Sequence, residues 1–543
     1  MPQGIRLAAR PTVHSGAVRV FAALLTLTLW ILPAAGFAQV QDARQPEPGE
    51  LWFSVGPGFE NWSDQFAKDS PRALSDGDSE PLASDFDGPI VSRLFPGVDP
   101  LVADLNADAN ALGFDSLSAG GLSLGDLDFG TINVMVRRVH IGLELGLSDR
   151  LSFEAGAPLV FTEVEPRFAF DSVRANVSAA SSAIPDPMAF FGQFEAAVGS
   201  LSDLVGSGSL NPAEQAAATA LLQDSGAFLA ALQRRVMTNG LLPLATSPAG
   251  AQITDRFGSL ADGFTALGLS LPAFALADLA TSADLAAFFG SPFVSAAVPG
   301  VTERNWTVGE AEAGLRYRVF NGPLPGHGSG GLVQLRTTLG GKVRFPLRQA
   351  DRPPFSDPDN FFDQPIGDGQ TDVELALYQD VEVGSGLLVN LVARYGIQLS
   401  DQLQLRVAPP DRPFALVSTR ALVERNLGDY LSVRVAPQVR LNRFLSIGVE
   451  YGFWHKGNDT YRLIQSGSGI TDARPLEVET RQTRQRLGLG LFYRTGQLVP
   501  RRSDGTPWQI AALFQSAISG SGGQTPVSQL FTFSVRAPLR LVP

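Results

Sequence analysis

The stretch L-S-F-E-A-G-A-P-L-V-F, residues 151–161, alternates between two kinds of side chain. The apolar or small members at every second position are Leu151, Phe153, Ala155, Ala157, Leu159 and Phe161. Ser152, Glu154 and Gly156 lie between them, and Thr162 continues that second set. Because side chains along a β-strand point alternately to opposite faces, the stretch predicts a strand with one apolar and one polar face.

The same two-faced pattern recurs along the chain, for example around 332–348, 431–441 and 484–494. It predicts twelve strands, near 51–62, 132–147, 151–165, 305–320, 332–348, 371–383, 387–407, 415–441, 445–457, 482–495, 507–518 and 526–541. Short connections at 148–150, 384–386 and 442–444 contrast with very long ones at 63–131 and 166–304. Long alternating strands with this loop asymmetry are typical of barrels that face lipid outside and water inside. We therefore expect an all-β fold, a transmembrane antiparallel β-barrel of about 12 strands, with an α-helical loop insertion.

The first 38 residues are typical of a cleaved signal peptide. Arg6, Arg10 and Arg19 form a basic leader, an apolar core of about 13 residues follows, and Gly36-Phe37-Ala38 supplies a small-x-small cleavage pattern. The apolar core is short of the roughly 20 residues that a spanning helix needs. We expect residues 39–543 to form the mature barrel in the outer membrane of a Gram-negative bacterium, with outer-membrane lipid and the assembly machinery as partners.

Charge and cysteine content exclude several function classes. The chain has 42 Lys and Arg against 54 Asp and Glu, and loss of the leader leaves 39 bases, a net charge of −15. We expect no nucleic-acid partner for such an acidic exported chain. The absence of cysteine rules out disulfides, cysteine nucleophiles and thiolate metal sites. We expect no cofactor and no metal.

The two longest connections differ in character. Residues 166–304 carry helix signals, such as Asn211, Pro212 and Glu214 at the positions of an N-cap and first turn. Helices are predicted near 187–204, 212–236, 252–267 and 282–290, either as a cap packing on itself or as an apolar capture surface over the pore mouth. Residues 63–130 hold thirteen acids and three bases and predict a solvated external loop.

The charged residues of the strands must face the lumen, because Arg or Lys facing lipid near the bilayer midplane costs about 2–4 kcal/mol. The bases so assigned are Arg138, Arg316, Arg318, Arg336, Lys342, Arg344, Arg348, Arg394, Arg406, Arg434, Arg440, Lys456, Arg484, Arg486, Arg494, Arg536 and Arg540. The acids so assigned are Glu144, Glu154, Glu310, Glu312, Asp372, Glu374, Asp380, Glu382 and Glu450. These residues form either an internal salt-bridge network or an arginine track that guides anionic groups.

Hairpin register makes one pair specific. If the 148–150 turn pairs Leu147 with Leu151, Glu144 lies opposite Glu154 inside the barrel. Facing carboxylates repel unless a cation lies between them. Arg316 and Arg318 on a neighbouring strand are the expected cations.

An enzyme is not expected. After loss of the leader the histidines are His140, His327 and His455. None of them accompanies a serine and a third orienting group in a pattern that a hydrolase would need. We predict no catalytic residue.

Four segments resemble a family of outer-membrane barrels. They are G-L-S-D-R-L-S-F-E-A-G-A-P-L-V-F (146–161), V-G-E-A-E-A-G-L-R-Y-R-V-F (308–320), G-D-G-Q-T-D-V-E-L-A-L (367–377) and the strand–turn–strand stretch 428–453. The family is the phenol meta-degradation type of transporter, distantly similar to fatty-acid and toluene outer-membrane transporters. The resemblance implies passage of small hydrophobic or aromatic compounds and no catalytic residues. The large helical insertion and the R-L-V-P terminus depart from its pattern.

Three functions follow as hypotheses. The first is a channel for passive passage of a small-molecule solute, hydrophobic or aromatic. The second is an anion-preferring, porin-like channel with an arginine-lined lumen. The third is a structural or adhesive barrel whose external loops bind a partner.

Overall fold

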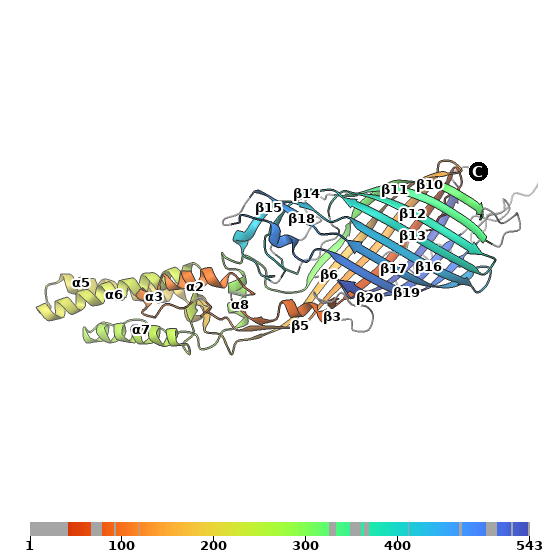
Figure 1. Ribbon diagram of the computed structural model, residues 1–543. Coiled ribbons are helices and arrows are strands. Elements are labelled where there is room, and N and C mark those ends of the chain that lie inside the picture. The colour runs from red at the N-terminus through yellow and green to blue at the C-terminus, as the bar shows by residue number, and fades with distance from the viewer. Residues whose placement is uncertain are drawn as a thin grey trace, which may run out of the picture.

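The structure is a computed structural model of the chain. It describes residues 42–66, 79–91, 94–118, 120–324, 333–347, 360–362, 367, 369–410, 412–465, 470–495, 508–522 and 525–540. A tilted barrel forms one end of an elongated molecule and a group of helices forms the other (Figure 1). The predicted signal peptide, residues 1–38, lies outside the described residues.

The described residues form a closed barrel of twelve antiparallel strands, which confirms the predicted fold class. Neighbours in the sheet run in the order β5-β1-β21-β20-β19-β17-β16-β13-β12-β11-β10-β6, and pairing of β5 with β6 closes the ring. The strands are β1 (Glu50–Trp62), β5 (Asp126–Gly146), β6 (Leu151–Asp171), β10 (Glu310–Pro323), β11 (Val333–Pro346), β12 (Asp372–Val383), β13 (Leu387–Gln398), β16 (Tyr430–Arg440), β17 (Leu445–Lys456), β19 (Gln482–Arg494), β20 (Gln509–Ser521) and β21 (Gln529–Arg540). Because the ring closes, the barrel wall has no unpaired edge along these strands.

The alternation in the sequence separates the two faces of the wall. On β11, Leu339 and Val343 are exposed on the outside, whereas Arg336 and Thr338 are buried inside. Other strands repeat the pattern, as at Leu489, which is 63% exposed. A continuous apolar surface of this kind marks contact with a membrane. No helix within the described residues is both long and apolar enough to span a bilayer.

The barrel has two different ends. The connections 147–150, 384–386 and 441–444 lie at one end, here called the short-turn end. At the other end, the cap end, β5 and β6 run 21 residues each and extend past the rim. The short strand β9 (Thr302–Val308) pairs with the distal part of β6, and β4 (Gly88–Pro89) pairs with β5.

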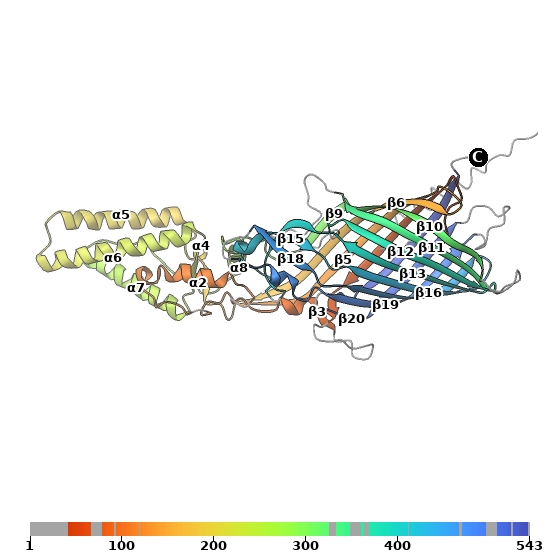
Figure 2. The ribbon, with the colours of Figure 1, turned by 45° about the horizontal axis from the view of Figure 1, so that its top comes forward.

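Two predicted strands are each divided in the structure. Residues 387–407 form β13 and then β14 (Asp401–Arg406), and residues 415–441 form β15 (Arg420–Asn426) and then β16. β14, β15 and β18 (Thr460–Gln465) make a separate three-stranded sheet at the cap end (Figure 2). Leu403 and Val423 are buried in its own small core, together with Ala473. The apolar alternation continues past the rim because this second core needs it too, so the sequence pattern alone did not reveal the break.

The connection 166–304 is helical, as its pattern predicts. Its helices are α4 (Ala180–Ala183), α5 (Pro187–Gly206), α6 (Pro212–Met237), α7 (Pro248–Ala266) and α8 (Ser282–Phe289), and β7 (Val177–Ala179) pairs with β8 (Leu241–Pro243). Asn211 and Glu214 make the expected reciprocal cap at the start of α6. Phe194, Phe228 and Phe257 pack together between the helices. The stripes therefore bury against one another, as expected for a cap that packs on itself.

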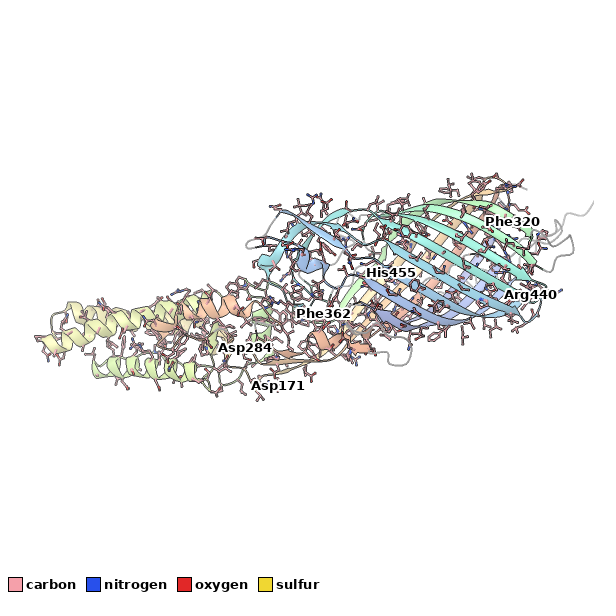
Figure 3. The ribbon with its side chains drawn as sticks, in the orientation of Figure 1. Asp171, Asp284, Phe320, Phe362, Arg440 and His455 are labelled. Atoms are coloured by element: carbon pink, nitrogen blue, oxygen red, sulfur yellow. The ribbon has the colours of Figure 1, made fainter. Side chains whose placement is uncertain are left out.

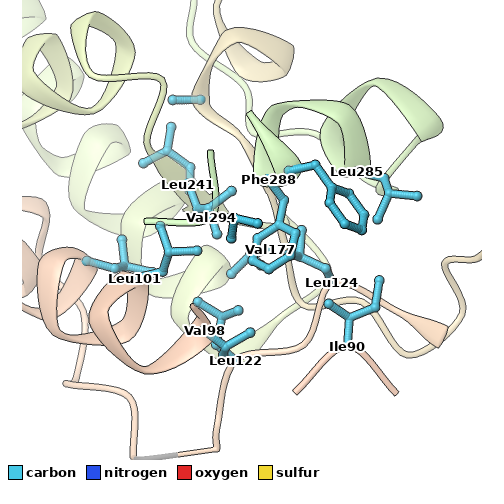
Figure 4. Close-up of a cluster of buried hydrophobic side chains, with 14 of the residues drawn as sticks. Ile90, Val98, Leu101, Leu122, Leu124, Val177, Leu241, Leu285, Phe288 and Val294 are labelled. Carbon is cyan, nitrogen blue, oxygen red and sulfur yellow. The ribbon is translucent and has the colours of Figure 1, made fainter. Parts of the chain in front are cut away.

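The first long connection differs from the prediction of a solvated loop. It contains α2 (Val98–Asn106), α3 (Ala109–Leu112), the short pair β2 (Asp64–Phe66) and β3 (Ser79–Pro81), and the 3-10 helix η1 (Leu82–Asp85); η2 (Val417–Thr419) and η3 (Arg474–Glu477) occur later. Val98, Leu101 and Leu122 lie in the same buried cluster as Leu241 and Phe288 from the helical insertion (Figure 4). The high acid content concealed this apolar stripe, and the two connections together form one cap.

Candidate functional site: the barrel lumen

The segment just before β1 lies inside the barrel. Residues 42–46 are buried. The backbone N–H of Ala43 donates to Asp380 (3.2 Å), and its carbonyl accepts a hydrogen bond from Thr338 Oγ1 (2.7 Å). The Asp42 carbonyl accepts from Arg316. This segment therefore contacts β10, β11 and β12 on one side of the lumen.

The side chain of Asp42 reaches the opposite side of the lumen. One carboxylate oxygen lies 3.1 Å from Arg536 Nη1 on β21, and the other lies 3.7 Å from Arg494 Nη2 on β19. Gln509 on β20 also donates to it (3.4 Å). The segment thus bridges the lumen near the short-turn end. Sequence reasoning missed this contact, because a short polar segment outside a strand carries no periodic signal.

The register predicted for the β5–β6 hairpin is confirmed. Glu144 lies directly opposite Glu154. Arg316 Nη1 lies 3.0 Å from Glu144, and Ser152 Oγ donates to the same carboxylate (2.8 Å). Arg316 therefore supplies the expected cation. Arg318 does not, because the pairing of β10 with β6 ends at Tyr317. Arg318 therefore lies level with the turn, where its backbone N–H donates to the Arg150 carbonyl.

A chain of charged contacts runs along one side of the lumen in its middle. Lys342 Nζ lies 2.7 Å from Glu312 and 3.3 Å from Glu374. His140 Nε2 lies 3.1 Å from the other oxygen of Glu312. This network links β5, β10, β11 and β12. Buried charges require such partners, because desolvation costs several kcal/mol per ion.

A second group of ion pairs lies toward the cap end. Arg344 Nη1 lies 3.1 Å from Asp372 and its Nη2 lies 3.6 Å from Glu374. Glu310 lies 4.0 Å from Arg344 Nε. The hydroxyl of Tyr430 donates to Glu374 (2.6 Å). Arg344 is thus shared among three acids, and the aromatic hydroxyl helps to hold Glu374.

Glu60 on β1 forms ion pairs with two arginines. Arg486 and Ser528 both donate to Glu60 Oε1, and Arg484 Nη1 lies 3.6 Å from the same oxygen. Sequence reasoning did not count Glu60, although it lies on the first predicted strand. Alternation along 51–62 was the signal that could have found it. Arg434 lies 3.8 Å from Glu450, on the neighbouring strand.

The charges of the lumen are distributed unevenly: one half of the wall is almost wholly basic, and the other mixes most of the acids with Arg138, Arg316, Arg336, Lys342 and Arg344. Strands β13, β16, β17 and β19 carry seven of the bases, namely Arg394, Arg434, Arg440, Lys456, Arg484, Arg486 and Arg494. Strands β1, β5, β6, β10 and β12 carry most of the acids, namely Glu60, Glu144, Glu154, Glu310, Glu312, Asp372, Glu374, Asp380 and Glu382. Figure 3 places Arg440 at the short-turn end of the basic half and His455 nearer the other rim. This arrangement directs an electric field across the lumen.

A hollow of about 410 Å³, continuous with solvent, lies on the basic half near the cap end. It is called the vestibule below. Its lining residues are Arg344, Glu374, Arg394, Gln398, Leu427, Tyr430, Ser432, Trp454 and Lys456. A second cavity, of only about 20 Å³, lies deeper and is lined in part by Glu144, Glu154, Glu312 and Arg316. The lumen is therefore open toward the cap and constricted toward the short-turn end.

Three bases that the sequence assigned to the lumen, Arg348, Arg406 and Arg540, are not found there among the described side chains. Arg406 does not lie in the lumen: it is on β14, where its guanidinium donates to the carbonyls of Val294, Ser295 and Ala415. It contacts the cap instead, because the predicted strand 387–407 divides at the rim. Arg348 and the side chain of Arg540 lie outside the described residues, as does His327. Arg336 is buried and donates to Asn321 (3.2 Å).

No family model and no curated protein matches the chain. Solved structures do match over most of its length. An outer membrane channel from Pseudomonas putida F1 is 9% identical, with 93% of this chain and 100% of that chain covered and a TM-score of 0.36. A Pseudomonas aeruginosa FadL homologue is 9% identical, with 94% and 99% covered and a TM-score of 0.28. The Pseudomonas putida toluene transporter TodX is 10% identical, with 91% and 90% covered and a TM-score of 0.24. Because these identities and TM-scores are low, the assignment of a barrel is based on the strand pairing of this chain. The proposal for its function is based on the residues of its own lumen.

Proposed function

We propose that this protein is an outer-membrane channel that lets small hydrophobic or aromatic compounds pass without an energy source. The observation that carries the proposal is the closed barrel, which has an apolar outer surface and holds the vestibule at the cap end. A solute with an apolar body meets Trp454, Tyr430 and Leu427 there before it reaches the ion pairs of the middle lumen. These three side chains supply the apolar and aromatic part of a lining that is otherwise polar or charged.

The location belongs to the same proposal. The apolar outer surface supports contact with outer-membrane lipid, and the predicted leader at 1–38 supports export through cleavage of a signal peptide. The short-turn end then faces the periplasm and the cap faces outward, as in other barrels of this membrane. Insertion would require the outer-membrane assembly machinery. We assign the protein no enzymatic activity.

The test is a pair of measurements on the full-length protein. Purified protein in planar bilayers is expected to show discrete conductance steps, and cells lacking the gene are expected to take up toluene more slowly than wild-type cells. A chain that gives no conductance, in cells whose toluene uptake is unchanged by deletion, would contradict the proposal. That result would instead favour a structural or adhesive barrel.

One observation favours a second function, an anion-preferring channel. The seven bases of β13, β16, β17 and β19 line one half of the lumen, and Glu450 is the acid that the described wall of those strands adds. Such a half-wall attracts anions. Reversal potentials in a salt gradient decide this point: a preference for chloride over potassium supports it, and a preference for potassium removes it.

A further inference from the structure

The vestibule is built on one row of the barrel wall. Arg394 on β13 lies directly opposite Ser432 on β16, which lies opposite Trp454 on β17, which lies opposite Arg484 on β19. These four side chains share the inner face because directly paired residues in an antiparallel sheet project to the same side. Ser432 is small, so a space remains between the guanidinium of Arg394 and the indole of Trp454.

Arg394 has donors to spare. Its side chain is 11% exposed, and neither its Nε nor its Nη2 makes a hydrogen bond to the described residues. The nearest acid is Glu374, whose oxygen lies 3.4 Å from Nε. That carboxylate already accepts a hydrogen bond from Tyr430 and pairs with Lys342. A buried guanidinium with unused donors gains from a planar acceptor that takes two of them.

The other lining groups favour an anion with an apolar body. Arg344 and Lys456 add positive charge to the walls, and Glu374 is the acid among the lining residues. Trp454 and Leu427 supply apolar surface beside Arg394, and the guanidinium of Arg484 lies 5.6 Å from the Trp454 ring centroid. A flat ring can lie on the indole while a carboxylate on that ring reaches Arg394.

We propose that the vestibule binds small aromatic carboxylates, with the carboxylate on Arg394 and the ring against Trp454. The proposal rests on the channel function above and names a substrate class for it. A carboxylate differs from the neutral aromatic compounds because it draws on both the basic half of the lumen and the unused donors of Arg394. The hydrogen bonds are charge-assisted, so discrimination against a neutral ligand of the same shape is expected to be at least about tenfold.

The test measures binding of 4-fluorobenzoate and of 4-fluorobenzyl alcohol to the full-length protein in detergent, by ligand-observed fluorine NMR. Wild-type protein is expected to bind the carboxylate at least about tenfold more tightly than the alcohol. Arg394→Gln is expected to remove this preference, and Trp454→Ala is expected to weaken the binding of both ligands. Arg440→Gln is the matched control, because Arg440 pairs with Glu382 on the same half of the wall but at the short-turn end.

Several outcomes contradict the proposal. Equal affinity for the two ligands does so, as does a carboxylate affinity that Arg394→Gln leaves unchanged or that Arg440→Gln lowers equally. Circular dichroism and heat-induced unfolding of each variant establish that the barrel is folded. The channel function is tested separately. If the wild-type protein binds the carboxylate specifically and Arg394→Gln does not, but no conductance appears in bilayers, the binding site stands and transport is excluded.

Discussion

Arg235 joins the two long connections through buried ion pairs. Its side chain is 1% exposed, and its guanidinium lies 2.6 Å from Asp104 and 2.6 Å from Asp108, both in the first connection. Asp108 is fully buried and also contacts Arg234 (2.7 Å). Replacing one partner of a buried pair leaves an uncompensated charge, which costs far more than loss of a surface ion pair.

We predict that Arg235→Met destabilises the cap by about 3–5 kcal/mol and leaves the barrel intact. Hydrogen exchange of α2 and α6 measures the stability of the cap, and hydrogen exchange of the barrel strands measures that of the barrel. Arg234→Met is the control, because Arg234 is 53% exposed and its loss is expected to cost about 1 kcal/mol or less. Equal effects of the two substitutions would show that burial of Arg235 does not matter.

Asp284 gives the cap a predictable dependence on pH. Burial alone would raise the pKa of its carboxyl, but hydrogen bonds from Ser182, Thr281 and the backbone N–H of Ala179 bring that pKa below its ordinary value of 3.8. The ionised carboxylate therefore stabilises the cap above pH 3.8, and this contribution is lost as pH falls through the lowered pKa.

We predict faster exchange of α8 and β7 below pH 3.8 than at pH 6, after correction for the intrinsic pH dependence of exchange. Asp284→Asn is expected to raise the exchange at pH 6 and to flatten the change with pH. Asp278→Asn, at an exposed position, is expected to behave as wild type. A cap whose protection is the same at both pH values in wild-type protein would exclude this role.

How far single residues could be predicted depended on how local their partners are. Glu144 and Glu154 were placed opposite each other from the length of one turn, and Arg316 followed from its position on the next strand. Arg318 was assigned wrongly because it lies beyond Tyr317, the last β10 residue paired with β6, and so lies level with the turn rather than beside the two carboxylates. Asp42 could not be placed, because its partners come from strands more than 270 residues away in sequence.

At the scale of elements, helix α6 shows which sequence signals act locally. Asn211 accepts hydrogen bonds from the backbone of Ala213 (3.0 Å) and Glu214 (2.9 Å), and the Glu214 side chain accepts from the Asn211 N–H (3.0 Å). These contacts satisfy donors that the first turn would otherwise leave free. Because every partner lies within three residues, this helix start was predictable from the sequence.

We predict that Asn211→Ala costs about 1 kcal/mol, measured as faster hydrogen exchange in the first turns of α6. Asn211→Asp, which keeps the accepting oxygen, is expected to retain protection. If exchange becomes faster only in the barrel, or does not change anywhere, Asn211 does not stabilise the start of α6. The division of 387–407 into β13 and β14 was beyond such reasoning, since only the neighbouring strands show where the barrel rim lies.

At the scale of the whole molecule, the segment at 42–46 joins opposite sides of the barrel lumen. Asp42 joins Arg494 and Arg536 on one side of the lumen, and the backbone of Asp42 and Ala43 joins Arg316, Thr338 and Asp380 on the other. Loss of the Asp42 carboxylate removes one side of this bridge. The backbone hydrogen bonds alone then hold the segment across the lumen.

We predict that Asp42→Ala raises single-channel conductance and its fluctuations at least about twofold, because release of half the contacts populates open states. Glu47→Ala is the control, since Glu47 lies in the same segment but is exposed. Bilayer recordings of both variants beside wild type provide the measurement. Identical conductance in Asp42→Ala and wild type would mean that the segment does not limit flow.

The length of β5 and β6 has a mechanical consequence. Residues 126–133 of β5 extend past the last residue paired with β1, so a two-stranded ribbon of about 27 Å projects from the rim. A second leg meets the cap where Arg406 of β14 holds the carbonyls of Val294 and Ser295. The cap is therefore attached to the barrel at two places, the β5–β6 ribbon and the β14 contact. We expect a sideways load on the cap to stretch one attachment and compress the other. We therefore expect the mouth of the barrel between these attachments to keep its width while the cap is pushed.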